Sequence, residues 1–158
     1  MMTIGIISDT HGLLRPEAIQ RLAGADHIIH AGDIGGPDVI AELRKIAPTT
    51  AIRGNVDRGA WASKYPDTAL VKFGDRSIYV LHDLGKLALD PAASGIDIVV
   101  SGHSHRPRFV TVGGVLYLNP GSAGPRRFTL PVALATLELT CNGICPHIHE
   151  LGRPGVTE

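Results

Sequence analysis

Five short apolar runs, rich in isoleucine and valine, recur along the chain and carry few polar residues. A strand that is buried on both faces has such a continuous apolar sequence, because neither of its faces meets solvent. The pattern therefore predicts five buried β-strands, at residues 3–8, 27–30, 49–53, 77–81 and 97–101.

Helix-like segments separate the first three runs. One begins near Pro16 and the other near Pro37, and proline is favoured in the first turn of a helix. In the second segment Val39, Ile40 and Leu43 recur with helical spacing. The alternation of strand and helix predicts a βαβαβ unit with parallel strands.

Hairpin signals dominate after residue 68. Gly-Asp, Gly-Gly and Asn-Gly pairs separate strand-like runs at 74–75, 113–114 and 142–143. A short helix is predicted between Asp90 and Ser94, with Asp90 as its cap. Together these elements predict an α/β fold in which two mixed β-sheets pack face to face with helices outside. Residues 152–158 are expected to form a loose tail.

Length and composition limit the class of protein. The 158 residues, 44% of them hydrophobic, suit a single domain over residues 1–158. The apolar runs are shorter than the roughly 20 residues that span a bilayer, and the N-terminus lacks a signal-peptide pattern, so we expect a cytoplasmic protein with no membrane partner. Lys plus Arg and Asp plus Glu both number 15, and this balance makes a nucleic-acid partner improbable.

A side chain that can bind a metal ion follows each of the five runs. Because the carboxyl ends of parallel strands share one rim of an α/β sheet, these side chains should meet in one place. Glycine precedes three of them, and its missing Cβ permits close approach of the backbone. The candidates are Asp9, His11, Asp33, Asn55, His82, His103 and His105.

The candidates indicate the kind of metal and the number of ions. Carboxylate, imidazole and amide groups suit manganese, iron, zinc or nickel, whereas calcium prefers oxygen ligands alone. Seven ligands are too many for one catalytic zinc ion, which usually takes three from the protein. Two divalent ions about 3.5–4 Å apart would use them all. Asp33, on the middle of the three helix-linked strands, is the natural bridge between them.

Each candidate alone has an ordinary structural explanation. Asp9 could cap a turn, and His82 could be a hydrogen-bonded core histidine. The recurrence at five consecutive strand ends favours metal binding. His27 and His30 lie within a strand, and we assign them to packing or to the surface.

A second group of possible ligands lies near the C-terminus. Cys145, His147 and His149 are close in sequence and could be interpreted as a zinc site. However, Cys141 and Cys145 do not form a C-x2-C pair, and strand alternation places His147 and His149 on one face. A solvated face is the favoured interpretation, and no disulfide is expected in a reducing compartment.

The motifs resemble those of the calcineurin-like metallophosphoesterases, in particular their small bacterial and archaeal phosphodiesterase branch. The resemblance runs from Asp9 to about Gly124. It rests on Asp9-x-His11, Gly32-Asp33, Gly54-Asn55, His82, Gly102-His103-Ser104-His105 and Asn119-Pro120-Gly121-Ser122.

This resemblance implies a four-layer α/β-β-α sandwich and a phosphoesterase, in the first place a phosphodiesterase. It implies that water activated by two metal ions, with manganese first among the candidates, attacks a small-molecule phosphate ester. Asp33, Asn55 and His82 would be the catalytic residues. By analogy, one ion would bind Asp9, His11 and His105, the other would bind Asn55, His82 and His103, and Asp33 would bridge them.

Two positions depart from the family pattern. Val56 stands where larger members have a histidine that assists the leaving group, and valine cannot donate a proton. Substrates with good leaving groups are then favoured, unless Asp57 or water supplies the proton. Asp83 stands where glycine is expected, and it could strengthen His82 as a ligand or repel an anionic substrate. Both aspartates could also orient metal ligands.

Substrate-binding residues are weakly indicated. The loop of Asn119, Gly121 and Ser122 could offer amide and hydroxyl groups to a phosphate, and Arg126 and Arg127 follow it. A Pro-Gly turn with solvated arginines explains these residues equally well. Arg53 and Arg58 lie on either side of Asn55, and each could likewise bind a phosphate or simply be solvated.

Other functions remain as alternatives. The resemblance extends to a eukaryotic retromer subunit that binds partner proteins, so a non-enzymatic scaffold is one alternative, although the complete ligand set favours an enzyme. A nuclease is a weaker alternative because the chain has no net positive charge. Edge strands of the hairpin region could pair two copies into a homodimer.

Overall fold

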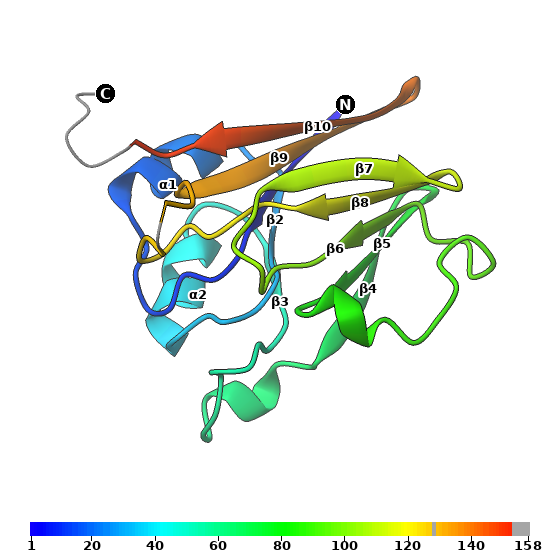
Figure 1. Ribbon diagram of the computed structural model, residues 1–158. Coiled ribbons are helices and arrows are strands. Elements are labelled where there is room, and N and C mark those ends of the chain that lie inside the picture. Colours follow the sequence, from blue (N-terminus) through cyan, green and yellow to red (C-terminus); the bar gives the residue numbers. More distant parts are fainter. Residues whose placement is uncertain (128, 153–158) are drawn as a thin grey trace.

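The computed structural model describes residues 1–127 and 129–152, in which two five-stranded sheets pack face to face (Figure 1). The first sheet has the strand order β10-β9-β1-β2-β3 and the second has the order β4-β5-β6-β8-β7. The first contains β1 (Met2–Ile7), β2 (His27–His30), β3 (Thr49–Ala51), β9 (Ala133–Thr140) and β10 (Gly143–Glu150). The second contains β4 (Thr68–Phe73), β5 (Arg76–Leu81), β6 (Ile98–Val100), β7 (Arg108–Val112) and β8 (Val115–Asn119).

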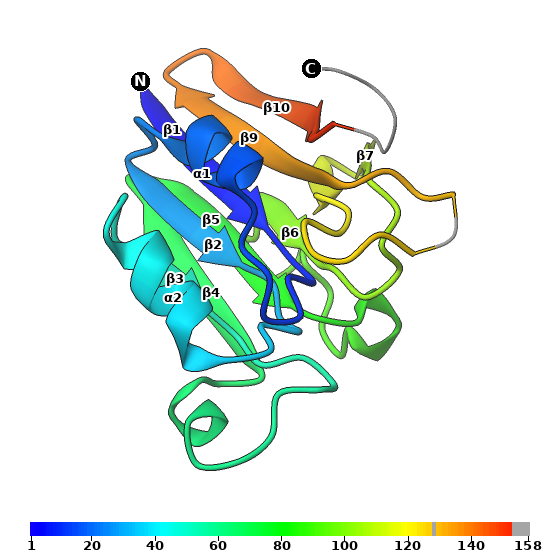
Figure 2. The ribbon, with the colours of Figure 1, turned by 90° about the vertical axis from the view of Figure 1, so that its left-hand side faces the viewer.

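The predicted βαβαβ unit forms the first half of the chain. Strands β1, β2 and β3 are parallel neighbours, joined through α1 (Pro16–Leu22) and α2 (Pro37–Arg44). Both helices cover the outer face of the first sheet, with the second sheet behind it (Figure 2). The predicted sandwich of two mixed sheets is thereby confirmed. No helix in the described part of the chain is long and apolar enough to cross a membrane.

The core lies in two main layers. Ile4 and Ile6 of β1 point between the sheets, where they pack with Ile78 and Ile98 of the second sheet. Residues of α1 and α2 fill the other layer, on the outer face of the first sheet. Fully burying one such side chain stabilises the fold by about 1.5–3 kcal/mol.

The outer face of the second sheet has a thinner cover. A loop that includes the short 3-10 helix η2 (Leu84–Lys86) packs over Val99 there. The prediction of a helix between Asp90 and Ser94 is wrong, because residues 91–95 form only hydrogen-bonded turns. Gly95, with φ of +75°, ends this segment after too few residues to offset the cost of starting a helix.

The three predicted hairpins are all present. Strand β4 pairs with β5, β7 with β8 and β9 with β10, each pair antiparallel. In the last hairpin the turn is formed by Cys141 and Asn142, and Gly143 is already the first residue of β10. Except for Gly152, the predicted tail lies outside the described residues.

Candidate metal centre

The five predicted strand ends converge, although they belong to different sheets. Strands β1, β2 and β3 lie in the first sheet, whereas β5 and β6 are parallel neighbours in the second. All five carboxyl ends nevertheless meet at one edge of the sandwich. His82, after β5, has its Nε2 atom 3.7 Å from Asp9 Oδ1, after β1, and 3.2 Å from Asp33 Oδ2, after β2.

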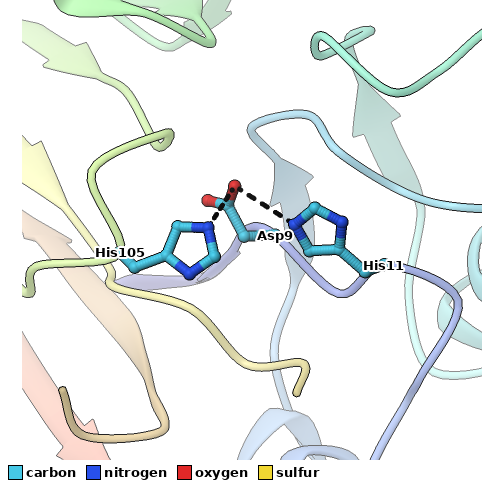
Figure 3. A group of neighbouring side chains, drawn as sticks. All are labelled: Asp9, His11 and His105. Atoms are coloured by element: carbon cyan, nitrogen blue, oxygen red, sulfur yellow. Dashed lines mark ion pairs between the residues drawn. The ribbon is translucent and has the colours of Figure 1, made fainter. Parts of the chain in front are cut away.

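One group of potential ligands consists of Asp9, His11 and His105. Their ligand atoms lie within 4.8 Å of one another. The Nε2 atom of His105 is 3.3 Å from Asp9 Oδ1, and that of His11 is 3.9 Å from the same oxygen. Figure 3 shows the two imidazole rings on either side of the carboxylate.

A second group, Asp33, His82 and His103, adjoins the first and has the same compact spacing. Asn55 lies beside it, with Nδ2 3.5 Å from His103 Nδ1. The two groups meet at His11, whose Nε2 is 3.7 Å from Asp33 Oδ2. The structure thus brings all seven predicted side chains into one cluster.

Hydrogen bonds orient these side chains. Asp9 Oδ2 accepts from the Ser8 hydroxyl at 2.7 Å and from the His103 amide at 3.1 Å, which leaves Oδ1 facing the cluster. His82 Nδ1 donates to the carbonyl of Ala31 at 2.7 Å, and in the neutral imidazole this leaves the Nε2 lone pair for a metal. Such bonds commonly fix the tautomer and direction of metal-binding histidines.

Unpartnered buried polar atoms are concentrated in this cluster. Across residues 1–127 and 129–152, four buried side-chain atoms have no hydrogen-bond partner: Asp9 Oδ1, His11 Nε2, His82 Nε2 and His105 Nδ1. Each such atom costs about 1–3 kcal/mol, so native proteins keep few of them without a reason. Lone pairs of carboxylate and imidazole are the donors that borderline divalent metals take, and the cluster fits such ions.

The backbone is strained at the same positions. The non-glycine residues with positive φ in the described chain are Asp9 (56°), His11 (47°), Asp33 (55°), His103 (71°) and His105 (63°). This left-handed conformation costs of order 1–3 kcal/mol at each position and typically clusters at functional sites. All five residues belong to the predicted ligand set. The apolar runs that precede them in the sequence did not indicate a left-handed backbone.

Two of the predicted glycines permit close approach within the cluster. A Cβ atom at Gly54 would meet the backbone nitrogen and Oδ1 of Asp33. A Cβ atom at Gly102 would meet the side chains of Ser8 and Asp9. A larger residue at either position would therefore displace a candidate ligand.

The pKa values of Asp9 and Asp33 are shifted in opposite directions. Burial raises the pKa of Asp9 above its usual value, against the opposing effect of His82. Burial would also raise the pKa of Asp33, but the His82 ring, 3.2 Å from its Oδ2, and the Val56 amide outweigh it and hold that pKa well below its usual range. For His82, burial lowers the pKa, yet the nearby Asp33 carboxylate and the bond to the Ala31 carbonyl outweigh it and raise the pKa. Since the neighbouring carboxylates favour the protonated ring of His82, a cation that binds its Nε2 competes with that proton.

Asp57 organises the loops rather than the ligand side chains. Its buried carboxylate accepts three backbone N–H groups at 2.9 Å, from Ile34, Gly35 and Gly54. Two of these amides follow Asp33 and the third precedes Asn55. Asp57 therefore ties together the turns that carry those two residues.

The structure shows what contacts Asp83 and Val56, the two departures from the family pattern. Asp83 Oδ1 accepts from the Gly85 amide and caps η2, which gives this carboxylate a structural role. Val56 is 50% exposed, while its amide donates to Asp33 Oδ1 at 3.1 Å.

His27 and His30 take part in packing. The ring of His27 contacts that of Phe73 edge to face. His30 is fully buried, and its Nδ1 accepts from the Gly32 amide at 3.1 Å, so its Nε2–H donates to the Thr10 hydroxyl at 3.0 Å.

Burial lowers the pKa of His30 to about 3 from the model-peptide value of 6.5. Between these pH values the unfolded chain takes up a proton that the folded protein does not, so the free energy of unfolding falls as pH falls. His30 contributes up to about 1.4 kcal/mol per pH unit to this loss. We expect His30→Gln to flatten the pH dependence between pH 6 and 4, measured by urea unfolding in the presence of a chelator. If the free energy of unfolding falls equally steeply with pH in the variant and the parent, the prediction is contradicted.

Two cavities adjoin the second group of ligands. The larger of the two, of about 560 Å³, is lined by Asn55 and His82, by basic residues and by acidic ones. The basic residues are Arg53, Arg58 and Lys86, and the acidic residues are Asp67 and Asp83. The tyrosine cavity, of about 320 Å³, is lined by His103, Arg106, Arg108, Val110 and Tyr117. The sequence singled out Arg53 and Arg58, whereas Arg106 and Arg108 carry no local motif and were missed.

The weakly indicated substrate residues lie as follows. Ser122 is buried, and its hydroxyl donates to the carbonyl oxygen of Asp9 at 3.0 Å. Asn119 donates to the Gly102 carbonyl at 2.9 Å and so supports the loop of His103. Arg126 is exposed, and Arg53 forms an ion pair with Asp67 at 3.0 Å.

Known proteins resemble this chain throughout. A probable metallophosphoesterase of Methanothermobacter thermautotrophicus is 33% identical over 142 residues, which cover 82% of each chain. A solved structure described as a novel archaeal phosphodiesterase has a TM-score of 0.77 at 26% identity, covering 94% of this chain and 100% of the other. Vps29 of Entamoeba histolytica, solved with zinc, has a TM-score of 0.72 at 22% identity and covers 96% of this chain and 100% of its own, a likeness of fold alone.

The family model for the calcineurin-like phosphoesterase superfamily domain matches residues 2–142. That segment runs from β1 to the turn of the last hairpin and contains every side chain of the cluster. Since the match extends over most of the chain, this protein belongs to the calcineurin-like phosphoesterase superfamily.

Proposed function

We propose that the protein is a phosphodiesterase that depends on two divalent metal ions. The observation that carries the proposal is the cluster itself, in which four buried donor atoms have no protein partner. Family membership supplies the reaction class, hydrolysis of a phosphate ester. The residues that would hold the ions are Asp9, His11, Asp33, Asn55, His82, His103 and His105.

The distances suggest how the ligands divide. Asp9, His11 and His105 would hold one ion, and Asn55, His82 and His103 the other. Asp33 would serve both, because its Oδ2 atom lies within 3.7 Å of His11 Nε2 and 3.2 Å of His82 Nε2. The donor set suits manganese, iron, zinc or nickel, and manganese is our first choice.

When bound, the ions would lower the pKa of water to yield a nucleophile and would neutralise phosphoryl oxygens. The protein holds the reacting groups in place. The Val56 amide fixes Asp33, the Ala31 carbonyl fixes the ring of His82, and the substrate phosphate would bind beside Asn55 and His82.

The two cavities favour a diester over a monoester. A diester has an organic group on each side of the phosphate, and here two cavities adjoin the ligand side chains, one at His103 and the other at Asn55 and His82. Arginines line both cavities, so each could hold an arm with polar or anionic groups. A monoester would fill only one of them.

The surroundings of Val56 favour a good leaving group. Its exposed isopropyl group sits next to Asn55 and cannot protonate a departing alkoxide. Asp57 uses both carboxylate oxygens to accept backbone amides, which leaves it poorly placed to serve instead.

Removal and return of metal test the proposal. Protein stripped with a chelator should not hydrolyse bis-p-nitrophenyl phosphate, and added manganese should restore turnover, with the diester preferred over p-nitrophenyl phosphate. Preference for the monoester would overturn the diesterase assignment. If manganese, iron, zinc and nickel all fail, the enzyme proposal fails. The exposed Phe109, Val110 and Val112 of β7 would then direct attention to a scaffold that binds a protein partner.

A further inference from the structure

A second compact group of metal-binding side chains lies on the hairpin of β9 and β10. In the strand register Cys145 pairs with Glu138, and His147 pairs with Thr136. Residues two apart on a strand point to the same face, and directly paired residues do as well. The side chains of Glu138, Cys145 and His147 therefore share one face of the hairpin.

The spacing within this group is close to that of a metal site. Cys145 Sγ lies 3.5 Å from His147 Nε2, which lies 3.8 Å from Glu138 Oε2. All three ligand atoms are within 4.8 Å of one another. Around a tetrahedral zinc ion, bond lengths of about 2.3 Å to sulfur and 2.0–2.2 Å to nitrogen or oxygen place ligand atoms about 3.4–3.6 Å apart. Small side-chain rotations would be enough to reach that geometry.

We propose that Glu138, Cys145 and His147 form a zinc-class metal site that is separate from the phosphoesterase centre. The site offers one thiolate, one imidazole and one carboxylate, and leaves a fourth position to water or an external ligand. Cys145 and His147 are exposed, so the ion would be accessible from solvent. The ring of His149 stacks beside His147 with centroids 6.3 Å apart, while its own Nε2 is engaged by Thr136.

The site lies far from the first cluster. Glu138 pairs with Thr3 of β1, and Asp9 comes six residues later along that strand and its following turn. At about 3.3 Å per residue this separation is about 20 Å. The two sites also differ in chemistry, because a thiolate selects zinc over manganese or magnesium.

The sequence favoured a solvated face for these residues, since it showed only the neighbours of Cys145 along β10. Glu138 comes from another strand, and only the register of the hairpin brings it to the histidine and the thiol. This third ligand distinguishes the group from an ordinary exposed His-Cys pair.

Cobalt(II) provides the test, because a cobalt–thiolate bond gives an intense near-ultraviolet charge-transfer band that oxygen and nitrogen ligands do not give. The full-length, chelator-stripped protein is titrated with cobalt(II) under a reductant that contains no thiol. The chain has two cysteines, which supplies a matched pair of variants. The parent and Cys141→Ser should show the band, and Cys145→Ser should not.

Zinc affinity tests the other two ligands. In competition with a chromophoric chelator, Glu138→Gln and His147→Gln should each weaken the zinc binding that depends on Cys145 by more than about tenfold. Asp33→Asn should keep the cobalt–thiolate band, and Cys145→Ser should keep phosphodiester hydrolysis, so the two proposals fail independently. Absence of the band in the parent, its survival in Cys145→Ser, its loss in Cys141→Ser, or unchanged affinity in Glu138→Gln and His147→Gln would overturn the assignment.

Discussion

Replacement of Asp33 by asparagine is expected to lower metal-dependent hydrolysis of bis-p-nitrophenyl phosphate by about 10²–10³-fold, the loss typical when one group of a catalytic constellation is removed. Asparagine keeps the shape and can still accept the Val56 amide, so the loops should hold their conformation. It lacks the negative charge that Asp33 presents to His11 and His82. The measurement is kcat/KM in saturating manganese, alongside the metal content of the purified variant.

The control for this change is Asp75→Asn. Asp75 is exposed in the turn between β4 and β5, at the opposite end of β5 from His82, and the same change there should leave kcat/KM within about twofold of the parent. If Asp33→Asn retains more than a third of the parent activity, Asp33 does not serve both ions, and the division of ligands given above is wrong.

Replacement of Asp57 by alanine is expected to lower the free energy of unfolding of the metal-free protein by about 3 kcal/mol or more, because three backbone N–H groups lose a charged acceptor. Activity should fall too, since the freed turns carry Asp33 and Asn55. Urea unfolding in the presence of a chelator gives the stability, and Asp57→Asn should fall between parent and alanine variant because it keeps one acceptor oxygen.

Asp67→Ala serves as the comparison for stability. Asp67 pairs with Arg53 at 3.0 Å, but its side chain is 79% exposed, so the change should cost less than about 1 kcal/mol. A similar small cost for Asp57→Ala would show that the three amides find other acceptors, and would remove its proposed role in holding the loops.

The sequence predicts those features of the fold that depend on local patterns. The run at 27–30 coincides with β2, whose central Ile28 and Ile29 are fully buried, as expected for a strand inside the sheet. Pro16 and Pro37 each begin a helix at the predicted place. The turn-forming pairs locate three hairpins, and the seven predicted ligands come together because each lies within five residues after the end of a strand.

Features that depend on contacts between distant segments were not predictable in this way. Nothing in 133–140 indicates that this strand pairs with β1, or that β5 and β6 belong to a different sheet from β1. The role of Asp57 is of the same kind: the sequence suggested that it orients a ligand side chain, whereas it binds backbone amides from two loops. The prediction of a short helix at 90–94 was wrong for a local reason, because a favourable cap alone cannot stabilise a helix of one turn.

The left-handed backbone of the cluster has a consequence for any redesign of its metal preference. Among residues with a side chain, aspartate, asparagine and histidine enter this conformation several times more readily than most others. Glutamate and cysteine also bind zinc, yet at Asp33 or His105 they would have to adopt φ values of 55° and 63°. The choice of amino acid is thus restricted twice, by coordination and by conformation. Exchange of one ligand type for another would require a new path for the loop as well as a new side chain.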